Sequence, residues 1–222
     1  MQVLIIAAHP DDEVLGVGGT VARHAISGDD VKVIIVAEGA TSRHHSSKDD
    51  VTDLHQAAKK SAHILGSSEP VFLGLPDNRL DSLDLLEITH AIENQAQNIK
   101  PQIVYTHHGG DLNLDHQIVH RAVLTAFRPL PKSFIRKIYG FETLSSTEWG
   151  SVSTGKTFLP SRYVDITDTL EDKIKALDCY EKEMRDFPHP RSVKTVRSLA
   201  SFRGSNIGVT AAEAFEVILD IH

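Results

Sequence analysis

The sequence predicts an α/β fold, a Rossmann-like and mostly parallel sheet with helices on both faces and a C-terminal α+β elaboration. Short runs of β-branched and apolar residues recur through the first 130 residues, and such runs are typical of strands buried on both faces of a sheet. Longer segments with helical periodicity separate these runs. Repeated strand–helix–strand units form parallel sheets with right-handed crossovers, so both observations favour the same fold class.

The N-terminal part is expected to alternate between strands and helices. In order, these are strand 3–7, helix 14–27, strand 31–36, helix 51–65, strand 71–73, helix 82–99, strand 103–106 and helix 116–127. The first two helices stop at Gly28 and Gly66, because glycine is common just after a helix C-terminus. Pro101 ends the third helix, since proline cannot continue it. The fourth helix has one apolar side that includes Ile118 and Val123.

The pattern changes after residue 127. The expected elements there are strands 134–141 and 161–166 and helices 169–185, 192–202 and 210–215. The sequence has no linker rich in proline and serine, no internal repeat and no low-complexity tract. We therefore predict one domain over residues 1–222, with a Rossmann-like core (1–130) and the C-terminal elaboration (131–222).

Composition and charge exclude several classes of protein. Of the 222 residues, 41% are hydrophobic and 24% are charged, as in ordinary globular proteins. The formal net charge of −7 argues against nucleic-acid binding, which needs a basic surface. The sequence lacks an apolar run of the roughly 18 residues that a membrane span requires. The short apolar N-terminus lacks the basic start of a signal peptide, and the single cysteine, Cys179, fits a reducing compartment, so we expect a cytoplasmic protein.

The strongest chemical signal follows the first strand, in the string Ala8-His9-Pro10-Asp11-Asp12-Glu13. In a doubly wound sheet, ligands bind outside the carboxyl ends of the strands. Pro10 restricts His9 to an extended backbone, so the helix starts just beyond it and His9 and Asp12 can aim at one point. The simpler alternative is that the three acidic residues only complement the dipole of the following helix.

A second polar cluster covers residues 107–116 and follows the fourth strand. Asp115 and His116 open the next helix there. In the common strand order 3-2-1-4, the first and fourth strands are neighbours, so His9 and His116 should line one crevice. Two histidines and a carboxylate with an open fourth position make the usual catalytic zinc set, and imidazole favours zinc over magnesium. His120, four residues after His116, is expected to pack or to support a ligand.

These strings resemble the LmbE-like, or PIG-L-like, zinc de-N-acetylases, which remove acetyl groups from sugars of the N-acetylglucosamine type. The resemblance covers nearly the whole chain. It rests on the first string and on Asp115-His116, and it extends to Gly18-Gly19, Leu73-Gly74-Leu75-Pro76-Asp77, His189-Pro190-Arg191-Ser192, Arg203-Gly204 and Ala212-Glu213-Ala214-Phe215.

The resemblance implies roles for individual residues and Zn²⁺ as the cofactor. His9, Asp12 and His116 match the zinc ligands of the family, and Asp11 matches its general base. Asp115 matches the carboxylate that supports the site. Asn113 stands where many relatives carry a histidine that stabilises the oxyanion. An amide can still donate a hydrogen bond to an oxyanion, but it cannot deliver a proton. We consider His108 and His189 for that proton transfer.

Zinc chemistry agrees with these implied roles, because zinc polarises a carbonyl and lowers the pKa of bound water towards ~7. Asp11 can then take the proton of that water.

The candidates for substrate binding are Arg43, Asp77, Arg79, His108 and His189. We expect His44 and His45 to share the loop of Arg43. Arg203 and Glu213 are expected to form a structural ion pair.

Three other functions stay open. Gly16, Gly18 and Gly19 suggest a nucleotide-binding Rossmann enzyme, but the spacing is not GxGxxG and the acidic string would repel a pyrophosphate. A non-catalytic sugar- or metal-binding homologue is the second. A zinc amidase that acts on another amide, such as a mycothiol-type conjugate, is the third.

The expected partner is a small molecule or a glycan conjugate. The family that the sequence resembles often forms trimers or hexamers, so a homo-oligomer is also expected.

Overall fold

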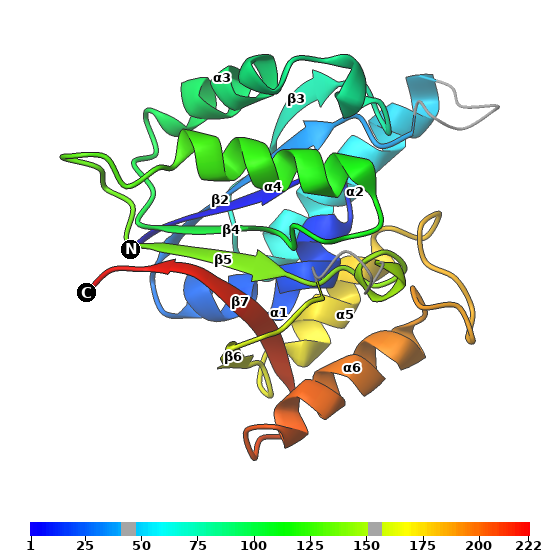
Figure 1. Ribbon diagram of the computed structural model, residues 1–222. Coiled ribbons are helices and arrows are strands. Elements are labelled where there is room, and N and C mark those ends of the chain that lie inside the picture. Colours follow the sequence, from blue (N-terminus) through cyan, green and yellow to red (C-terminus); the bar gives the residue numbers. More distant parts are fainter. Residues whose placement is uncertain (41–47, 151–156) are drawn as a thin grey trace.

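The computed structural model describes residues 1–40, 48–150 and 157–222. Within these ranges the chain forms one mixed sheet covered by helices on both faces (Figure 1). The strands are β1 (Gln2–Ala7), β2 (Asp30–Ala37), β3 (Val71–Leu75), β4 (Ile103–His107), β5 (Lys137–Phe141), β6 (Arg162–Asp165) and β7 (Ala212–Asp220). The α-helices are α1 (Asp12–Ile26), α2 (Lys48–Leu65), α3 (Leu85–Ala96), α4 (Leu114–Ala126), α5 (Leu170–Asp178) and α6 (Val193–Ser205), and short 3₁₀ turns cover Leu80–Ser82 and Thr147–Trp149.

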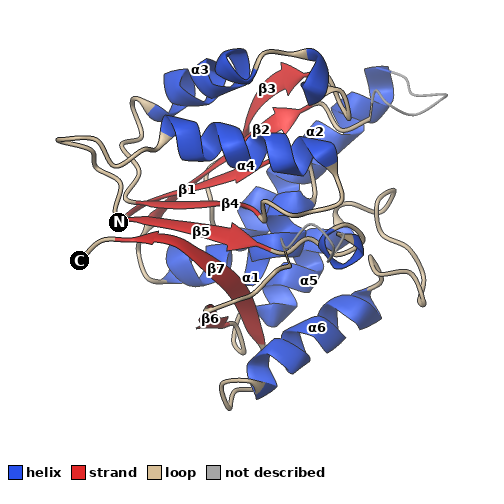
Figure 2. Cartoon of the chain, viewed as in Figure 1, coloured by secondary structure: helices blue, strands red, loops and turns tan. Residues whose placement is uncertain are grey.

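The seven strands lie in the order β3-β2-β1-β4-β5-β7-β6. The pairs from β3 to β5 are parallel, and β7 is antiparallel to both of its neighbours (Figure 2). The predicted order of the first four strands, 3-2-1-4, is therefore confirmed, as is the predicted α/β fold class. Because β1 and β4 are neighbours, the residues that follow them meet at one edge of the sheet.

The strand β1 shows how the sheet builds a core on both faces. Successive side chains of a strand point to opposite faces. Val3 and Ile5 pack in the cluster under α1, α2 and α5, whereas Leu4 and Ile6 pack in the cluster under α3 and α4. All four are fully buried, and each contributes about 1.5–3 kcal/mol of hydrophobic stabilisation.

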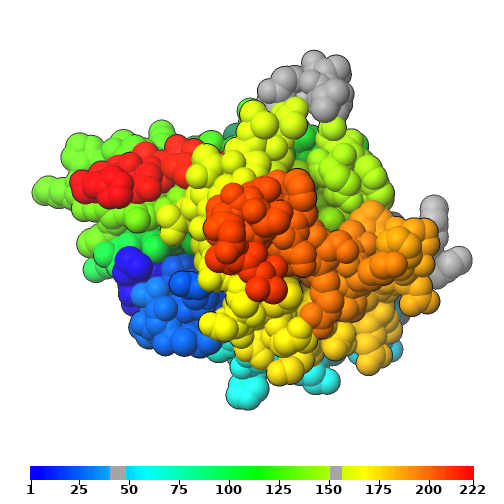
Figure 3. All heavy atoms as spheres, turned by 90° about the horizontal axis from the view of Figure 1, so that it is seen from below, coloured from blue at the N-terminus to red at the C-terminus, as the bar shows by residue number. Residues whose placement is uncertain are grey.

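Two predicted helices are shorter than expected. The segment expected as helix 82–99 contains the end of a 3₁₀ turn, an extended residue at Leu83 and then α3. The helix expected over 169–185 ends at Asp178. Tyr180, which follows it, is buried. The yellow and orange segments that include α5 and α6 spread over the underside of the molecule (Figure 3).

The helix predicted over 210–215 is wrong, because residues 212–220 form strand β7 between β5 and β6. The alanines and glutamates there favour a helix locally, but pairing with two strands overrides that preference. Phe215 pairs with Phe141 on one side and with Arg162 on the other.

Among the described residues, none of the helices combines the length and apolar character needed to cross a membrane.

The glycines that suggested a nucleotide site lie inside α1 and serve packing. A Cβ atom on Gly16 would collide with the ring of Phe141, and one on Gly19 would lie 2.8 Å from Ile166. Gly16 and Gly19 therefore allow α1 to approach the sheet and the chain beyond β6. This placement removes the basis for a phosphate-binding loop.

Candidate metal centre and catalytic site

The predicted ligands His9, Asp12 and His116 meet where β1 and β4 end. His9 follows β1, Asp12 is the first residue of α1 and His116 lies in the first turn of α4. Asp12 Oδ2 lies 3.3 Å from His9 Nδ1 and 3.2 Å from His116 Nε2. One ligand atom from each residue lies within 4.8 Å of the others, so a single ion can contact all three.

The local environment of these residues fits a cation. Asp12 is fully buried, and its Oδ1 has no hydrogen-bond partner among the described residues. A buried carboxylate oxygen without a donor is costly unless a cation neutralises it. Two imidazoles and one carboxylate also match the donor set of catalytic zinc sites.

A second group of possible ligands consists of His9, Asp77 and Asp115. It uses the other ring nitrogen of His9, since His9 Nε2 lies 3.4 Å from Asp77 Oδ1 and 3.1 Å from Asp115 Oδ2. Asp115 already accepts hydrogen bonds from the backbone N–H groups of Asn78 and Leu80. Asp115 is therefore better placed to orient His9 than to bind a second ion, as in carboxylate–histidine–zinc triads.

His116 has a matching orienting carboxylate, Asp111, which the sequence analysis missed. His116 Nδ1 lies 3.2 Å from Asp111 Oδ1. Asp111 also accepts hydrogen bonds from the hydroxyl groups of Ser146 and Thr147. Burial opposes ionisation of Asp111, but the contacts with His116, Ser146 and Thr147 outweigh it and lower the pKa of Asp111 to about 2.

His107 lies behind His116 and was also missed as a functional residue. Its ring stacks on that of His116 with centroids 3.9 Å apart, and its Nε2 accepts a hydrogen bond from the Ala8 N–H at 2.8 Å. Burial holds the pKa of His107 well below its usual value, so the ring is neutral and can accept. His120, expected to pack or support, has Nδ1 at 2.8 Å from the His107 carbonyl oxygen.

The electrostatics of the site demand positive charge. Burial lowers the pKa of His9, but contacts with Asp115, Asp12 and Asp77 outweigh it and raise that pKa to about 10. Burial also lowers the pKa of His116, but contacts with Asp12 and Asp111 outweigh it and raise that pKa to about 9. Carboxylates that hold protons on two imidazoles would hold a divalent cation in the same place.

Asp11, the predicted base, has an unusual backbone and a charged partner. Its φ of 109° lies in the left-handed region that few non-glycine residues adopt. Its N–H donates to Glu13 Oε2 at 3.0 Å, and its Oδ2 accepts from Arg191 Nη1 at 2.6 Å. Burial raises the pKa of Asp11 well above its usual value, Arg191 opposes that shift, and Asp12 adds to it.

Asn113 is the N-terminal capping residue of α4. Its Oδ1 accepts hydrogen bonds from the N–H groups of Asp115 at 2.8 Å and His116 at 3.4 Å. Its Nδ2 donates to Asn78 Oδ1 at 3.1 Å, at the edge of the site. The amide therefore positions the start of the helix that carries Asp115 and His116.

A cavity of about 140 Å³ lies beside these groups. Its lining residues come from the segments that follow β1 to β5 and from the segment between α5 and α6: His9, Pro10, Asp11, Gly39, Asp77, Asn78, Asn113, His116, Ser145, Ser146, Glu183 and Arg191. It brings together Asp11, Asp77, Asn113 and the two histidines predicted as ligands.

Other expected substrate residues lie outside this cavity lining. Arg79 is exposed, His108 Nδ1 lies 2.6 Å from Glu216 Oε2, and His189 Nδ1 accepts from the Arg191 N–H. Arg43, with its neighbours His44 and His45, falls outside the described residues.

The expected ion pair between Arg203 and Glu213 is wrong. Arg203 instead binds Glu142 through two hydrogen bonds of 2.8 and 2.7 Å. Glu213 accepts from Lys173 Nζ at 2.6 Å and from the N–H groups of Gly19 and Thr20. Because Glu213 lies on a strand and not on a helix, its side chain contacts α1 and α5.

A parallel α/β sheet with two histidines and a carboxylate at the carboxyl ends of its strands is typical of metal-dependent hydrolases. Comparison with protein families makes this class specific. The model of the GlcNAc-PI de-N-acetylase (PIG-L) family matches residues 4–127, more than half of the chain. The chain belongs to this family, and the resemblance found in its sequence is confirmed.

Relatives named as deacetylases support the same class. The E. coli K12 protein described as uncharacterised deacetylase YaiS is 32% identical over 149 residues, which cover 65% of this chain and 75% of the relative. The diacetylchitobiose deacetylase of Thermococcus kodakarensis is 28% identical over 236 residues, which cover 98% and 83%. These relatives are deacetylases, which are amide hydrolases, and the predicted enzyme class is thereby confirmed.

Solved structures share the fold. The N,N'-diacetylchitobiose deacetylase of Pyrococcus horikoshii superposes with a TM-score of 0.80 at 22% identity, over 98% of this chain and 83% of that one. GalB, the 4-carboxy-2-hydroxymuconate hydratase of Pseudomonas putida, superposes with a TM-score of 0.76 at 20% identity, over 100% and 98%. The fold thus hosts more than one reaction, so the reaction must be argued from the site.

Proposed function

We propose that this protein is a zinc-dependent de-N-acetylase that removes the acetyl group from an N-acetylglucosamine-type sugar or its conjugate. The observation that carries the proposal is the arrangement of two adjacent aspartates. Asp12 lies between two histidines, whereas Asp11 lines the cavity beside them. A metal-dependent hydrolase of this kind needs a metal ligand and a second carboxylate that can move a proton, and this pair would supply both.

The residues would divide the reaction as follows. His9, Asp12 and His116 would hold Zn²⁺, which when bound polarises a carbonyl oxygen and acidifies water. Asp11 accepts a proton from the attacking water at a carboxylate oxygen and later returns it to the leaving amine nitrogen. Asp115 and Asp111 keep the two imidazoles in the orientation that ligation requires.

Polar groups on the cavity wall suit a sugar. Asp77, Asn78 and Ser145 line the cavity with carboxylate, amide and hydroxyl groups. Such groups pair with hydroxyls, and an acetamido sugar presents several. The diacetylchitobiose activity of the T. kodakarensis relative supports a substrate of this kind. Another acetamido conjugate, such as a mycothiol precursor, stays within the same proposal.

The decisive experiment is acetate release. Zinc-loaded protein is incubated with a panel of N-acetylglucosamine conjugates, and acetate is quantified beside the His116→Ala variant. We expect one zinc ion per chain and acetate from at least one member, with none from the variant. A wild type that binds zinc and releases no acetate from any acetamido sugar contradicts the proposal. The one-domain division, the homo-oligomer and the cytoplasmic location stay predictions.

A further inference from the structure

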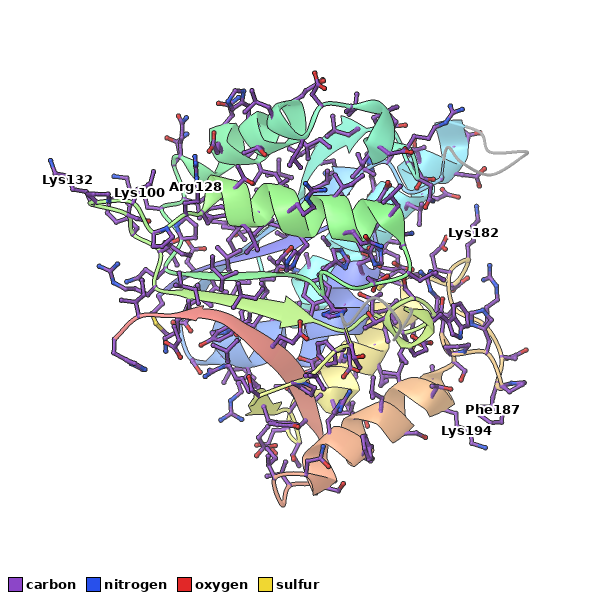
Figure 4. The ribbon with its side chains drawn as sticks, viewed as in Figure 1. Lys100, Arg128, Lys132, Lys182, Phe187 and Lys194 are labelled. Carbon is purple, nitrogen blue, oxygen red and sulfur yellow. The ribbon has the colours of Figure 1, made fainter. Side chains whose placement is uncertain are left out.

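The proposed base is held by residues that lie far from it in sequence. Asp11 belongs to the turn between β1 and α1, and Arg191 lies two residues before α6. The intervening segment after α5 reaches the carboxyl end of the strands, where Figure 4 shows Lys182 and Phe187, whereas Lys100, Arg128 and Lys132 mark the opposite end of the molecule. Arg191 thus comes from outside the family-matched residues 4–127.

The backbone of Asp11 leaves little freedom. Its carbonyl oxygen accepts hydrogen bonds from the N–H groups of Val14 and Leu15 at 3.0 and 2.9 Å, at the start of α1. Its N–H donates a hydrogen bond to Glu13. A strained φ of 109° persists only where surrounding contacts impose it. The backbone therefore fixes where the Cβ of Asp11 lies, and the direction of the carboxylate is the freedom that remains.

Like charges act on that direction. Asp12 and Glu13 are buried beside Asp11, and repulsion between carboxylates in a dry site is strong. Arg191 opposes it, because its Nη1 lies 2.6 Å from Asp11 Oδ2 and 3.6 Å from Glu183 Oε2. A planar guanidinium between two carboxylates has a defined orientation, which a lysine ammonium cannot reproduce.

The position of Arg191 is itself well defined. Its N–H donates to His189 Nδ1 at 3.1 Å, and its carbonyl accepts from the Arg185 N–H at 3.3 Å. The next residue, Ser192, caps α6 by accepting from the Thr195 N–H. The helix start thus anchors the backbone from which the guanidinium reaches Asp11.

We propose that Arg191 is a positioning residue, which holds the carboxylate of Asp11 at the angle from which it can take a proton from water beside the metal. This inference rests on the proposed function, because only that function makes Asp11 the base. It predicts that the C-terminal segment contributes to turnover without touching either the metal or the reacting atoms. His189 then acts on the Arg191 backbone, and not as a proton donor.

The test compares Arg191→Gln and Arg191→Lys with the matched control Arg197→Gln, an exposed arginine of α6 that pairs with Glu171. We expect Arg191→Gln to keep its zinc and its KM while kcat falls about 100-fold, the scale of a small misplacement of a reacting group. Arg191→Lys should recover only part of kcat. Guanidinium ion should partly restore kcat to Arg191→Ala, and Arg197→Gln should match wild type.

A crystal structure of Arg191→Gln supplies a readout besides activity. The Asp11 carboxylate should leave its wild-type position there, while His9, Asp12 and His116 stay in place. An unmoved carboxylate, a kcat equal to that of the control, a loss confined to KM or a loss of zinc overturns the inference. If wild type releases no acetate, the proposed function fails, and the crystal structure still decides whether Arg191 positions Asp11.

Discussion

The two parts of the chain contribute different things to the site. Residues before 127 supply the candidate metal ligands His9, Asp12 and His116, each at a strand end or in the first turn of a helix. Residues after 140 supply contacts to carboxylates that lie beside those ligands: Ser146 and Thr147 bind Asp111, Tyr180 binds Glu13, and Arg191 binds Asp11. The comparison teaches that the reacting groups and some of the contacts that align them come from different segments, which mutations can separate.

The largest expected effect removes a donor. Asp12→Ala deletes the carboxylate that lies between His9 and His116, so the variant should lose most of its zinc and all measurable turnover. The fold should persist, because the site lies at the edge of the sheet and not in its core. Metal analysis of the purified protein measures the loss, with circular dichroism as the fold control. Full zinc occupancy in Asp12→Ala contradicts the ligand role.

The next effect separates the neighbouring aspartate. Asp11→Asn should keep zinc, because Asp11 is not among the donors, and should lower kcat by roughly 10²–10⁴-fold, the contribution of general-base catalysis. The loss should fall on kcat more than on KM, since the proton moves only in the transition state. Zinc content and steady-state kinetics of both variants decide. If Asp11→Asn sheds zinc as readily as Asp12→Ala, the two roles are not distinct.

A carboxylate that orients a ligand should have a smaller effect. Asp111→Asn keeps the shape but weakens the hold on His116 Nδ1, so zinc affinity should fall by about 10–100-fold. Competition with a chelator measures this affinity. Asp81→Asn, at an exposed carboxylate in the 3₁₀ turn, is the matched control and should bind zinc like wild type. Equal affinities in the two variants would show that Asp111 serves only the fold of its loop.

The sequence predicted that His9, Asp12 and His116 lie together, because they stand next to local landmarks. A strand end, a proline and a helix start placed His9 and Asp12 at one edge, and the strand order brought His116 beside them. Asp111 and His107 were missed, although both belong to the cluster around His116. A glycine turn and a run of histidines mark that cluster without showing which side chains face the ligand.

The C-terminal part was harder for a physical reason. Strand β7 pairs with β5 and β6. Its conformation therefore depends on residues distant in sequence, which the local preference of its own residues does not include. Arg191 was named only within a string of the resemblance, and its contact with Asp11 spans 180 positions. No periodicity relates residues that far apart. The pairing appears only once the sheet, α5 and the start of α6 are in place.

The smallest effect concerns the backbone of Asp11. The Tyr180 hydroxyl donates to Glu13 Oε1, while Glu13 Oε2 accepts the Asp11 N–H. Burial and the Glu13 carboxylate raise the pKa of Tyr180 well above its usual value, so the hydroxyl keeps its proton and can donate. Tyr180→Phe removes that donor and leaves Glu13 with one fewer partner in a buried place. A buried polar group that loses its partner costs about 1–3 kcal/mol.

We therefore expect Tyr180→Phe to lower the free energy of unfolding by that amount, while zinc stays bound. Turnover should change less than in Asp12→Ala, Asp11→Asn or Arg191→Gln, because the Asp11 side chain keeps its own contact with Arg191. Urea unfolding and steady-state kinetics measure the two effects, and Tyr163→Phe, at a half-buried tyrosine of β6, is the control. A turnover loss as large as that of Arg191→Gln would show that the backbone and the side chain of Asp11 are held as one unit, which would end the separation between chemistry and alignment at this residue.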